Sequence, residues 1–160
     1  MEMLTTIDQA QLKQSFSRIA ASTSVITLVD EQQGKMGFTA TTVTSVSVEP
    51  PLILVCVNNL SRTVPVFQSG SRFVINLLTD KQQLIGMRFA SRDADKFVDV
   101  SYTIRPTGAL YLNDTLASLE CTPHEIYPAG DHHIVIGRVM DIHIGEDEQP
   151  LVFFRSRFMA

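Results

Sequence analysis

The chain has 160 residues, of which 44% are hydrophobic and 19% charged, values of a globular protein long enough to bury a core without disulfides or metals. Asp and Glu number 17 against 13 Lys and Arg, a net charge of −4, so the chain lacks the basic surface that non-specific nucleic-acid binding needs. The longest apolar run, residues 52–57, is too short to span a bilayer. Residues 1–6 lack the features of a signal peptide, and we therefore expect a cytoplasmic protein without membrane segments.

The cysteines and histidines give no sign of a metal site. Cys56 lies inside the apolar run, and Cys121 has no second cysteine near it, so neither has the spacing of a zinc site or a redox pair. We expect both to be buried free thiols. The four histidines also lack helical metal-ligand spacing, and no metal is predicted.

The first part of the chain is predicted to form a helix and two strands. Asp8, with Gln11 three residues later, has the spacing of a capping box at a helix start. The apolar face of that helix comprises Leu12, Phe16, Ile19 and Ala20. Two β-branched strands follow over residues 24–29 and 38–48, separated by a polar turn and ended by a pair of prolines.

The middle of the chain alternates predicted strands with two short helices. A strand over residues 52–57 leads to a helix over 63–69, which has proline in its first turn and glycine just past its end. A strand over residues 72–78 then leads to a helix over 80–90. The capping-box pair of this helix consists of Thr79 and Gln82.

The last part of the chain is predicted to be strand, over residues 116–121, 133–144 and 151–154. Several short strands with few helices favour an antiparallel barrel over a layered α/β fold. The sequence contains neither a dinucleotide fingerprint nor a P-loop. It also contains no internal repeat or linker, and we expect one domain over residues 1–160.

The most unusual stretch, residues 37–47, has small and hydroxylated side chains. Its hydroxyl residues are Thr39, Thr41, Thr42, Thr44, Ser45 and Ser47. Such side chains let a flat polar ring lie close to the backbone and form hydrogen bonds without formal charge. The alternative is an ordinary half-exposed strand, because threonine suits any pleated surface.

A second stretch, residues 58–63, lies between a predicted strand and a predicted helix. Ser61, Arg62 and Thr63 suit an anion there, because hydroxyls, a guanidinium and the free N–H groups of a helix start all donate to it. The alternative is that Ser61 or Thr63 only caps the helix and that Arg62 is solvated.

Three further stretches have side chains that suit a ligand. Residues 89–97 form a charged loop between two phenylalanines, which covers a ligand or only connects two elements. Within residues 130–139, His132 and His133 are adjacent on a predicted strand and point to opposite faces, so only one of them faces a site. We assign the surface position to His133. The aromatic and arginine side chains of residues 153–158 cover a pocket or only pack against the chain end.

Taken in order, these stretches resemble the short-chain flavin reductases of two-component flavin-dependent monooxygenases. These are the FMN-binding split-barrel enzymes typified by the reductase component of 4-hydroxyphenylacetate and phenol hydroxylases. The resemblance extends from Phe16 to Phe158, and its most specific parts are residues 37–40, 45–47, 50–51, 73–78, 89–90, 116–121 and 130–132. It implies a six-stranded antiparallel Greek-key split β-barrel that forms a homodimer. It also implies that NADH or NADPH reduces FMN, FAD or riboflavin for a partner oxygenase.

The resemblance also assigns site residues. The flavin ring would lie against Thr39, Ala40, Thr41, Thr42 and Val43. The flavin phosphate would be held by Ser61, Arg62 and Thr63. The rest of the flavin groove would be lined by Phe89, Ala90 and Ser91, with Lys96 and Phe97 nearby. The nicotinamide would face His132 as the catalytic residue, and the cofactor mouth would be flanked by Arg155 and Phe158.

Some questions stay open in the sequence. Phe158 stands where many relatives have tyrosine. Arg62 stands where relatives vary, so the sequence does not decide whether the flavin is FAD or FMN. Hydride transfer needs two stacked rings and no nucleophile, which agrees with a site made of threonines, backbone and one histidine. Two other interpretations are a fixed flavin that reduces another acceptor and a flavin-binding electron-transfer module.

Overall fold

A computed structural model of the chain describes residues 6–92 and 95–159. Residues 1–5, which entered the signal-peptide prediction, lie outside the described part, as do Asp93 and Ala94 of the predicted charged loop. Most of the described elements are strands and the helices are short, which confirms the predicted mostly-β class. Within residues 6–92 and 95–159, no helix is long and apolar enough to cross a membrane.

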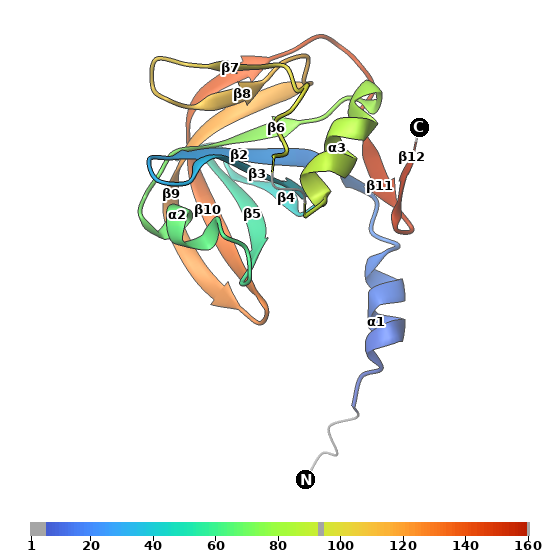
Figure 1. The fold of residues 1–160 in the computed structure, drawn as a ribbon. Coiled ribbons are helices and arrows are strands. Elements are labelled where there is room, and N and C mark those ends of the chain that lie inside the picture. The colour runs from blue at the N-terminus through green and yellow to red at the C-terminus, as the bar shows by residue number, and fades with distance from the viewer. Residues whose placement is uncertain (1–5, 93–94, 160) are drawn as a thin grey trace.

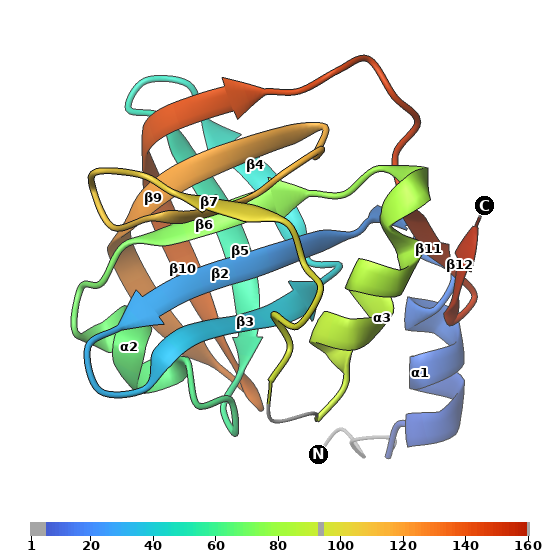
Figure 2. The ribbon, with the colours of Figure 1, turned by 45° about the horizontal axis from the view of Figure 1, so that its top comes forward.

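Seven strands form one antiparallel, curved sheet (Figures 1 and 2). In spatial order they are β3 (Gly34–Ala40), β2 (Ser24–Asp30), β6 (Phe73–Leu77), β9 (Ala117–Ala129), β10 (His132–Ile144), β5 (Leu52–Asn58) and β4 (Val43–Ser47). The predicted count of six strands is wrong for this sheet. Strand structure is interrupted at Thr41 and Thr42, so the predicted strand over residues 38–48 is divided into β3 and β4. These two strands lie at opposite edges of the sheet. These edges are not hydrogen-bonded to each other, and the described sheet is not closed into a barrel.

The long hairpin of β9 and β10 differs most from the sequence prediction. β9 continues to Ala129 although Pro123 and Pro128 interrupt the strand pattern. Pro123 lies where the register with β10 shifts, and a bulge accommodates a residue that has no N–H to donate. Gly130, with φ +62°, makes the turn into β10.

Two smaller sheets accompany the main one. The first contains β1 (Ala21–Ser22), β11 (Val152–Phe154) and β12 (Arg157–Met159), and the second is the hairpin of β7 (Tyr102–Ile104) and β8 (Leu110–Leu112). The sequence predicted β11 alone among these five strands. The others are two or three residues long, too short to show an alternating pattern.

The helices begin where the sequence predicts. In α1 (Gln9–Phe16), Asp8 accepts a hydrogen bond from Ala10 N–H over 3.0 Å. The helix ends at Phe16, so the predicted face does not continue to Ile19 and Ala20, and none of its residues is buried. In Figure 1, α1 extends away from the sheet. α2 (Val64–Gln68) is shorter than predicted.

The third predicted helix starts as a 3₁₀ turn, η1 (Asp80–Gln82), and continues as α3 (Gln83–Ala90). The predicted capping box of Thr79 and Gln82 is present at its start.

The core lies inside the curved sheet, and α2 closes one end of it. The Phe67 ring of α2 packs edge-on against Phe73 of β6, with ring centroids 5.1 Å apart. Met36 and Ala40 of β3 point into this core. The opposite face of β3 packs against α3, because Gly37 contacts Phe89 there. This arrangement brings the loop before α2 and the segment after α3 to the two sides of β3 (Figure 2).

Candidate functional site

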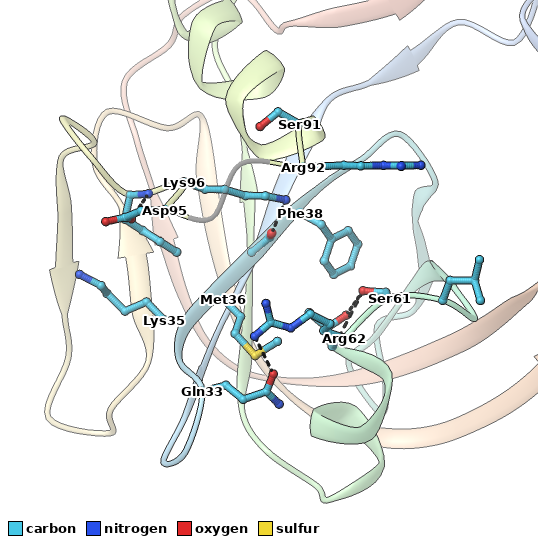
Figure 3. Close-up of a pocket in the computed structure, with 14 residues that line it drawn as sticks. Gln33, Lys35, Met36, Phe38, Ser61, Arg62, Ser91, Arg92, Asp95 and Lys96 are labelled. Atoms are coloured by element: carbon cyan, nitrogen blue, oxygen red, sulfur yellow. Dashed lines mark hydrogen bonds between the residues drawn. The ribbon is translucent and has the colours of Figure 1, made fainter.

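A cavity of about 730 Å³ opens between β3, the loop before α2 and the segment after α3 (Figure 3). Its wall consists of Gln33, Lys35, Met36, Gly37, Phe38, Leu60, Ser61, Arg62, Thr63, Ser91, Arg92, Asp95, Lys96 and Phe97. This volume lies within the usual range for small-molecule pockets. The wall brings together six of the residues predicted for cofactor binding, namely Ser61, Arg62, Thr63, Ser91, Lys96 and Phe97.

The loop before α2 presents two hydroxyl groups to the cavity. Leu60 N–H donates to Asn58 Oδ1 over 2.9 Å, which turns the chain at the end of β5. Ser61 Oγ and Thr63 Oγ1 are 2.8 Å apart, and Thr63 N–H donates to Ser61 Oγ over 3.3 Å. The Thr63 side chain does not cap α2. The two hydroxyls therefore stand together in the wall, where one donates to the other and the second O–H can donate to an anion.

Arg62 lies exposed beside these hydroxyls, with a neutral partner. Its guanidinium donates to Gln33 Oε1 over 3.1 Å, and Figure 3 shows it turned toward Gln33 and Met36. In the described part of the chain, no carboxylate lies within ion-pair distance of Arg62. The charge of the guanidinium is thus available to a ligand.

The segment after α3 is attached to β3 through Lys96. Its ammonium donates to the carbonyl of Phe89 over 2.9 Å and to that of Gly37 over 3.3 Å. Phe97 is 7% exposed and packs edge-on against Phe89, with ring centroids 5.0 Å apart. This segment is therefore one wall of the cavity and not only a solvated connection.

Phe89 supports the cavity from behind. It is 1% exposed, and a Cβ on Gly37 would lie 2.6 Å from its ring and 3.0 Å from the Ile26 carbonyl oxygen. Only glycine allows this close approach of α3 to β3. Ala90, predicted with Phe89, is exposed at the end of α3 and is not part of the wall.

The predicted ring wall and the predicted cofactor mouth lie outside the cavity. Thr39 Oγ1 donates to the Gly86 carbonyl of α3 over 2.6 Å, and the Phe158 ring packs beside Gly86. Arg155 lies over the ring of its neighbour Phe154. None of the residues predicted for the ring wall and the cofactor mouth borders the cavity, namely Thr39, Ala40, Thr41, Thr42, Val43, Arg155 and Phe158. Their roles toward a cofactor stay predictions.

His132 lies at the tip of the β9–β10 hairpin, outside the cavity wall. β10 begins at His132, opposite Asn58 of β5, so His132 and His133 are both in the strand and point to opposite faces. His132 Nδ1 lies 2.6 Å from the Asp131 carboxylate, a hydrogen bond that lowers the pKa of Asp131. His133 is half-buried, as is His132.

Asn59 joins this hairpin tip to the cavity loop. Its N–H donates to the Asp131 carbonyl over 3.0 Å, and its side-chain amide donates to the Gly130 carbonyl over 3.1 Å. Since Asn59 directly precedes Leu60, the loop that lines the cavity is fixed to the turn that carries His132.

Sequence reasoning missed eight residues of the wall, which are Gln33, Lys35, Met36, Gly37, Phe38, Leu60, Arg92 and Asp95. Gly37 and Phe38 belong to the stretch that carried the resemblance, but they bear no hydroxyl group. Lys35 ends the polar turn between two strands, and this basic residue was the available signal. Within the described residues, no group of three His, Cys, Asp or Glu side chains is arranged to hold a metal ion.

Positive charge is concentrated around the cavity. Among the described residues, its wall contains four basic side chains, Lys35, Arg62, Arg92 and Lys96, and one acidic side chain, Asp95. Lys35 donates to the Tyr102 hydroxyl over 2.7 Å, and this hydrogen bond raises the pKa of Lys35. The lysine is therefore charged at neutral pH. Because the whole chain is acidic, this local excess of positive charge indicates an anionic ligand.

Comparison with known proteins identifies relatives along nearly the whole chain. The family model described as "Flavin reductase like domain" matches residues 16–160. The actinorhodin polyketide dimerase of Streptomyces coelicolor is 39% identical over 153 residues, 96% of this chain and 86% of that protein. The flavin-dependent monooxygenase reductase subunit HsaB of Rhodococcus jostii is 31% identical, over 95% of this chain and 77% of that protein.

A solved structure shares the fold. The Streptomyces globisporus NADH:FAD oxidoreductase SgcE6, in complex with NAD and FAD fragments, has a TM-score of 0.91 and 28% identity. The match covers 100% of this chain and 96% of that chain.

Proposed function

The chain belongs to the flavin reductase like domain family, and from that premise we propose that it transfers hydride from NADH or NADPH to FMN or FAD and supplies reduced flavin to a partner monooxygenase. The family match over residues 16–160 carries this proposal. Relatives named as a monooxygenase reductase subunit and an NADH:FAD oxidoreductase support it. The sequence predictions of a flavin reductase, and of a flavin with a nicotinamide reductant, are confirmed at the level of the family.

The cavity fits a flavin that carries phosphate. Ser61 and Thr63 offer paired hydroxyls, and Arg62 adds a charge that no described carboxylate compensates. Charge-assisted hydrogen bonds of this kind are the strong ones in anion recognition. We assign the flavin phosphate to these three residues.

The flavin, when bound, supplies the hydride acceptor, so the protein needs no nucleophile of its own. Residues 39–43 would present backbone to the ring, because the Thr39 hydroxyl is already bonded to Gly86. His132 would contact the nicotinamide, held in one orientation by its hydrogen bond with Asp131. The remaining role of the chain is to hold both rings at reacting distance.

Steady-state oxidation of NADH with and without added FMN or FAD tests the proposal. We expect NADH oxidation that rises with added flavin and saturates. Turnover with another acceptor that is independent of added flavin would instead indicate a fixed flavin. Absence of NADH oxidation under all conditions would leave only the electron-transfer module.

The same assay addresses a relative that is named for another reaction. The 39% identical protein is called a polyketide dimerase, so membership of the family does not by itself fix the reaction. Flavin-dependent NADH oxidation by the purified chain, with no polyketide present, distinguishes flavin reduction from a role confined to such a partner substrate.

We also propose that the fold is the Greek-key split β-barrel implied by the resemblance, in one flavin reductase-like domain over residues 1–160. The main sheet is strongly curved, and its edge strands β3 and β4 are consecutive in the chain. These observations support a barrel that is split between β3 and β4. A crystal structure with bound flavin tests this directly.

A homodimer is the assembly that we propose. Within the apolar segment of residues 151–154, Leu151 is fully buried. Apolar side chains near α1 are exposed, with Phe16 at 61% and Ile19 at 66%. A second copy would remove this surface from water. Light scattering at micromolar concentration should give the mass of a dimer, and a monomeric mass would contradict it.

A further inference from the structure

The cavity has more positive charge than one phosphate site uses. Ser61, Arg62 and Thr63 suffice for the flavin phosphate in the proposed function, on which this inference rests. Lys35 and Arg92 also line the cavity, and no carboxylate of the described residues lies within ion-pair distance of either. In Figure 3 their side chains point away from each other. Lys35 is hydrogen-bonded to the Tyr102 hydroxyl, and cations that lack an ion-pair partner among the described residues along one cavity indicate a ligand whose negative charge is also spread.

The order of residues along β3 shows which end of the cavity lies farther from the proposed position of the flavin ring. The proposed ring position begins at Thr39, and Lys35 precedes it by four residues, which is about 13 Å along a strand. Residues 39–43 do not border the cavity, whereas Lys35, Met36, Gly37 and Phe38 do. A flavin with its ring at residues 39–43 and its phosphate at Ser61 therefore leaves the Lys35 end free for whatever follows the phosphate.

The volume of the cavity agrees with an extended ligand. A phosphate has five non-hydrogen atoms, which at the volume of a water molecule each fill about 150 Å³. The cavity measures about 730 Å³. The phosphate alone therefore fills only part of the cavity, which has room for the groups attached to the phosphate on either side.

The Lys35 end of the cavity is arranged to meet a second negative group. The Arg62 guanidinium turns toward this end, where it meets Gln33. The Lys35 ammonium is held by the Tyr102 hydroxyl over 2.7 Å. The Asp95 carboxylate accepts from Phe97 N–H over 3.0 Å, and it is outnumbered by the basic side chains around it.

We propose that this chain selects FAD over FMN, with Lys35 and the Arg62 guanidinium at the second phosphate and the adenosine beyond it. FMN ends before Lys35, so Lys35 is a specificity-determining residue for the dinucleotide flavin. Arg62 lies between both positions and contributes to the binding of either flavin.

Isothermal titration of the purified chain with FAD, FMN, riboflavin and ADP tests this assignment. We expect FAD to bind about tenfold or more tightly than FMN, and ADP to compete with FAD. Lys35→Met keeps the length of the side chain and removes its charge, and it should weaken FAD binding about tenfold while FMN binding changes less than twofold. Lys13→Met, on exposed α1, is the matched control and should change neither.

Tyr102→Phe gives a second test that keeps the lysine. It removes the hydroxyl that holds Lys35, and it should weaken FAD binding alone, by a smaller factor than Lys35→Met. Equal wild-type affinity for FAD and FMN, or equal losses for both flavins in Lys35→Met, would overturn the FAD assignment while flavin-dependent NADH oxidation still supported the reductase. Failure to bind any flavin would overturn both.

Discussion

Two polar regions of this molecule differ in how their charges are compensated. Glu120 of β9 is 1% exposed, and its carboxylate accepts from Arg72 over 2.8 Å and from Tyr111 over 3.0 Å. Around the cavity, Lys35 and Arg62 donate to neutral oxygen atoms, those of Tyr102 and Gln33. The first region satisfies its charge within the fold, whereas the second leaves charge for a ligand.

The comparison shows how a structural polar cluster is told from a binding one. A buried carboxylate without partners would destabilise the protein by several kcal/mol, so the fold must supply them. Exposed cations carry no such penalty and can remain uncompensated until a ligand arrives. Substitutions around Glu120 should therefore change stability, and substitutions around the cavity should change affinity.

The largest effect is expected for Glu120→Leu. This change leaves the Thr107 hydroxyl without its acceptor and the Tyr111 hydroxyl with only the longer bond to Asp141, and it should lower the free energy of unfolding by about 3 kcal/mol. Arg72 is 41% exposed, and its hydration keeps the loss from being larger. Urea unfolding measures the change. The folded variant should bind flavin with wild-type affinity, and a selective loss of affinity would contradict the division between the two regions.

The opposite pattern is expected for Arg62→Ala. It removes a charge-assisted contact of roughly 1.5–3 kcal/mol with the phosphate. FMN and FAD should bind about tenfold or more weakly, with riboflavin much less affected. Urea unfolding should be unchanged, because among the described residues the guanidinium of Arg62 donates only to the exposed Gln33 amide. Equal losses for FMN and riboflavin would show that Arg62 does not contact phosphate.

His132→Ala tests the proposed nicotinamide contact at the tip of the β9–β10 hairpin. Loss of a nicotinamide contact should raise KM for NADH and lower kcat/KM about tenfold, equivalent to about 1.4 kcal/mol of transition-state binding. The flavin Kd should stay nearly constant. The variant also removes the hydrogen bond that lowers the pKa of Asp131, but a carboxyl group with its ordinary pKa is still ionised at neutral pH, so only the imidazole is lost.

His133→Ala is the control for the hairpin tip, because its side chain points to the other face. Its NADH kinetics should stay at the wild-type level, and any change should appear in stability, since His133 is half-buried. Exchanged behaviour of the two variants would reverse the assignment of the nicotinamide contact.

The smallest effect concerns Cys121, the neighbour of Glu120. Burial, with a smaller contribution from the Glu120 charge, raises the pKa of Cys121 to about 12. At pH 8 the native thiol is protonated and should not react with iodoacetamide, whereas the partly exposed Cys56 should react. Mass spectrometry of the labelled peptides gives the result. Above pH 9 the unfolded thiol ionises and the native one does not, so this group should lower stability as pH rises.

Local signals in the sequence predicted those features that depend on neighbours in the chain. Asp8 caps α1, and Thr79 with Gln82 forms the capping box before α3, because both interactions join residues within one turn. The loop of Ser61, Arg62 and Thr63 was also found, since its position between a strand and a helix is visible in the sequence.

Contacts between distant segments were beyond the sequence. Lys35 donates to Tyr102, which lies 67 positions later in the sequence. Tyr102 belongs to β7, a strand of three residues that is too short to show an alternating pattern in the sequence. The break of the threonine-rich strand into β3 and β4 depends on which strands each half joins. Phe89, which was predicted to line the flavin groove, instead packs against Gly37 behind β3, and this contact also joins distant segments.

The two hydrogen bonds of Asn59 have a consequence for the precision of the site. They join the turn of Gly130 and Asp131 to the loop that begins at Leu60, so the proposed contacts of the nicotinamide and of the flavin phosphate are attached to each other. Since hydride transfer requires both rings to be held at reacting distance, the amide of Asn59 would couple the positions of the two cofactors, although it contacts neither ring.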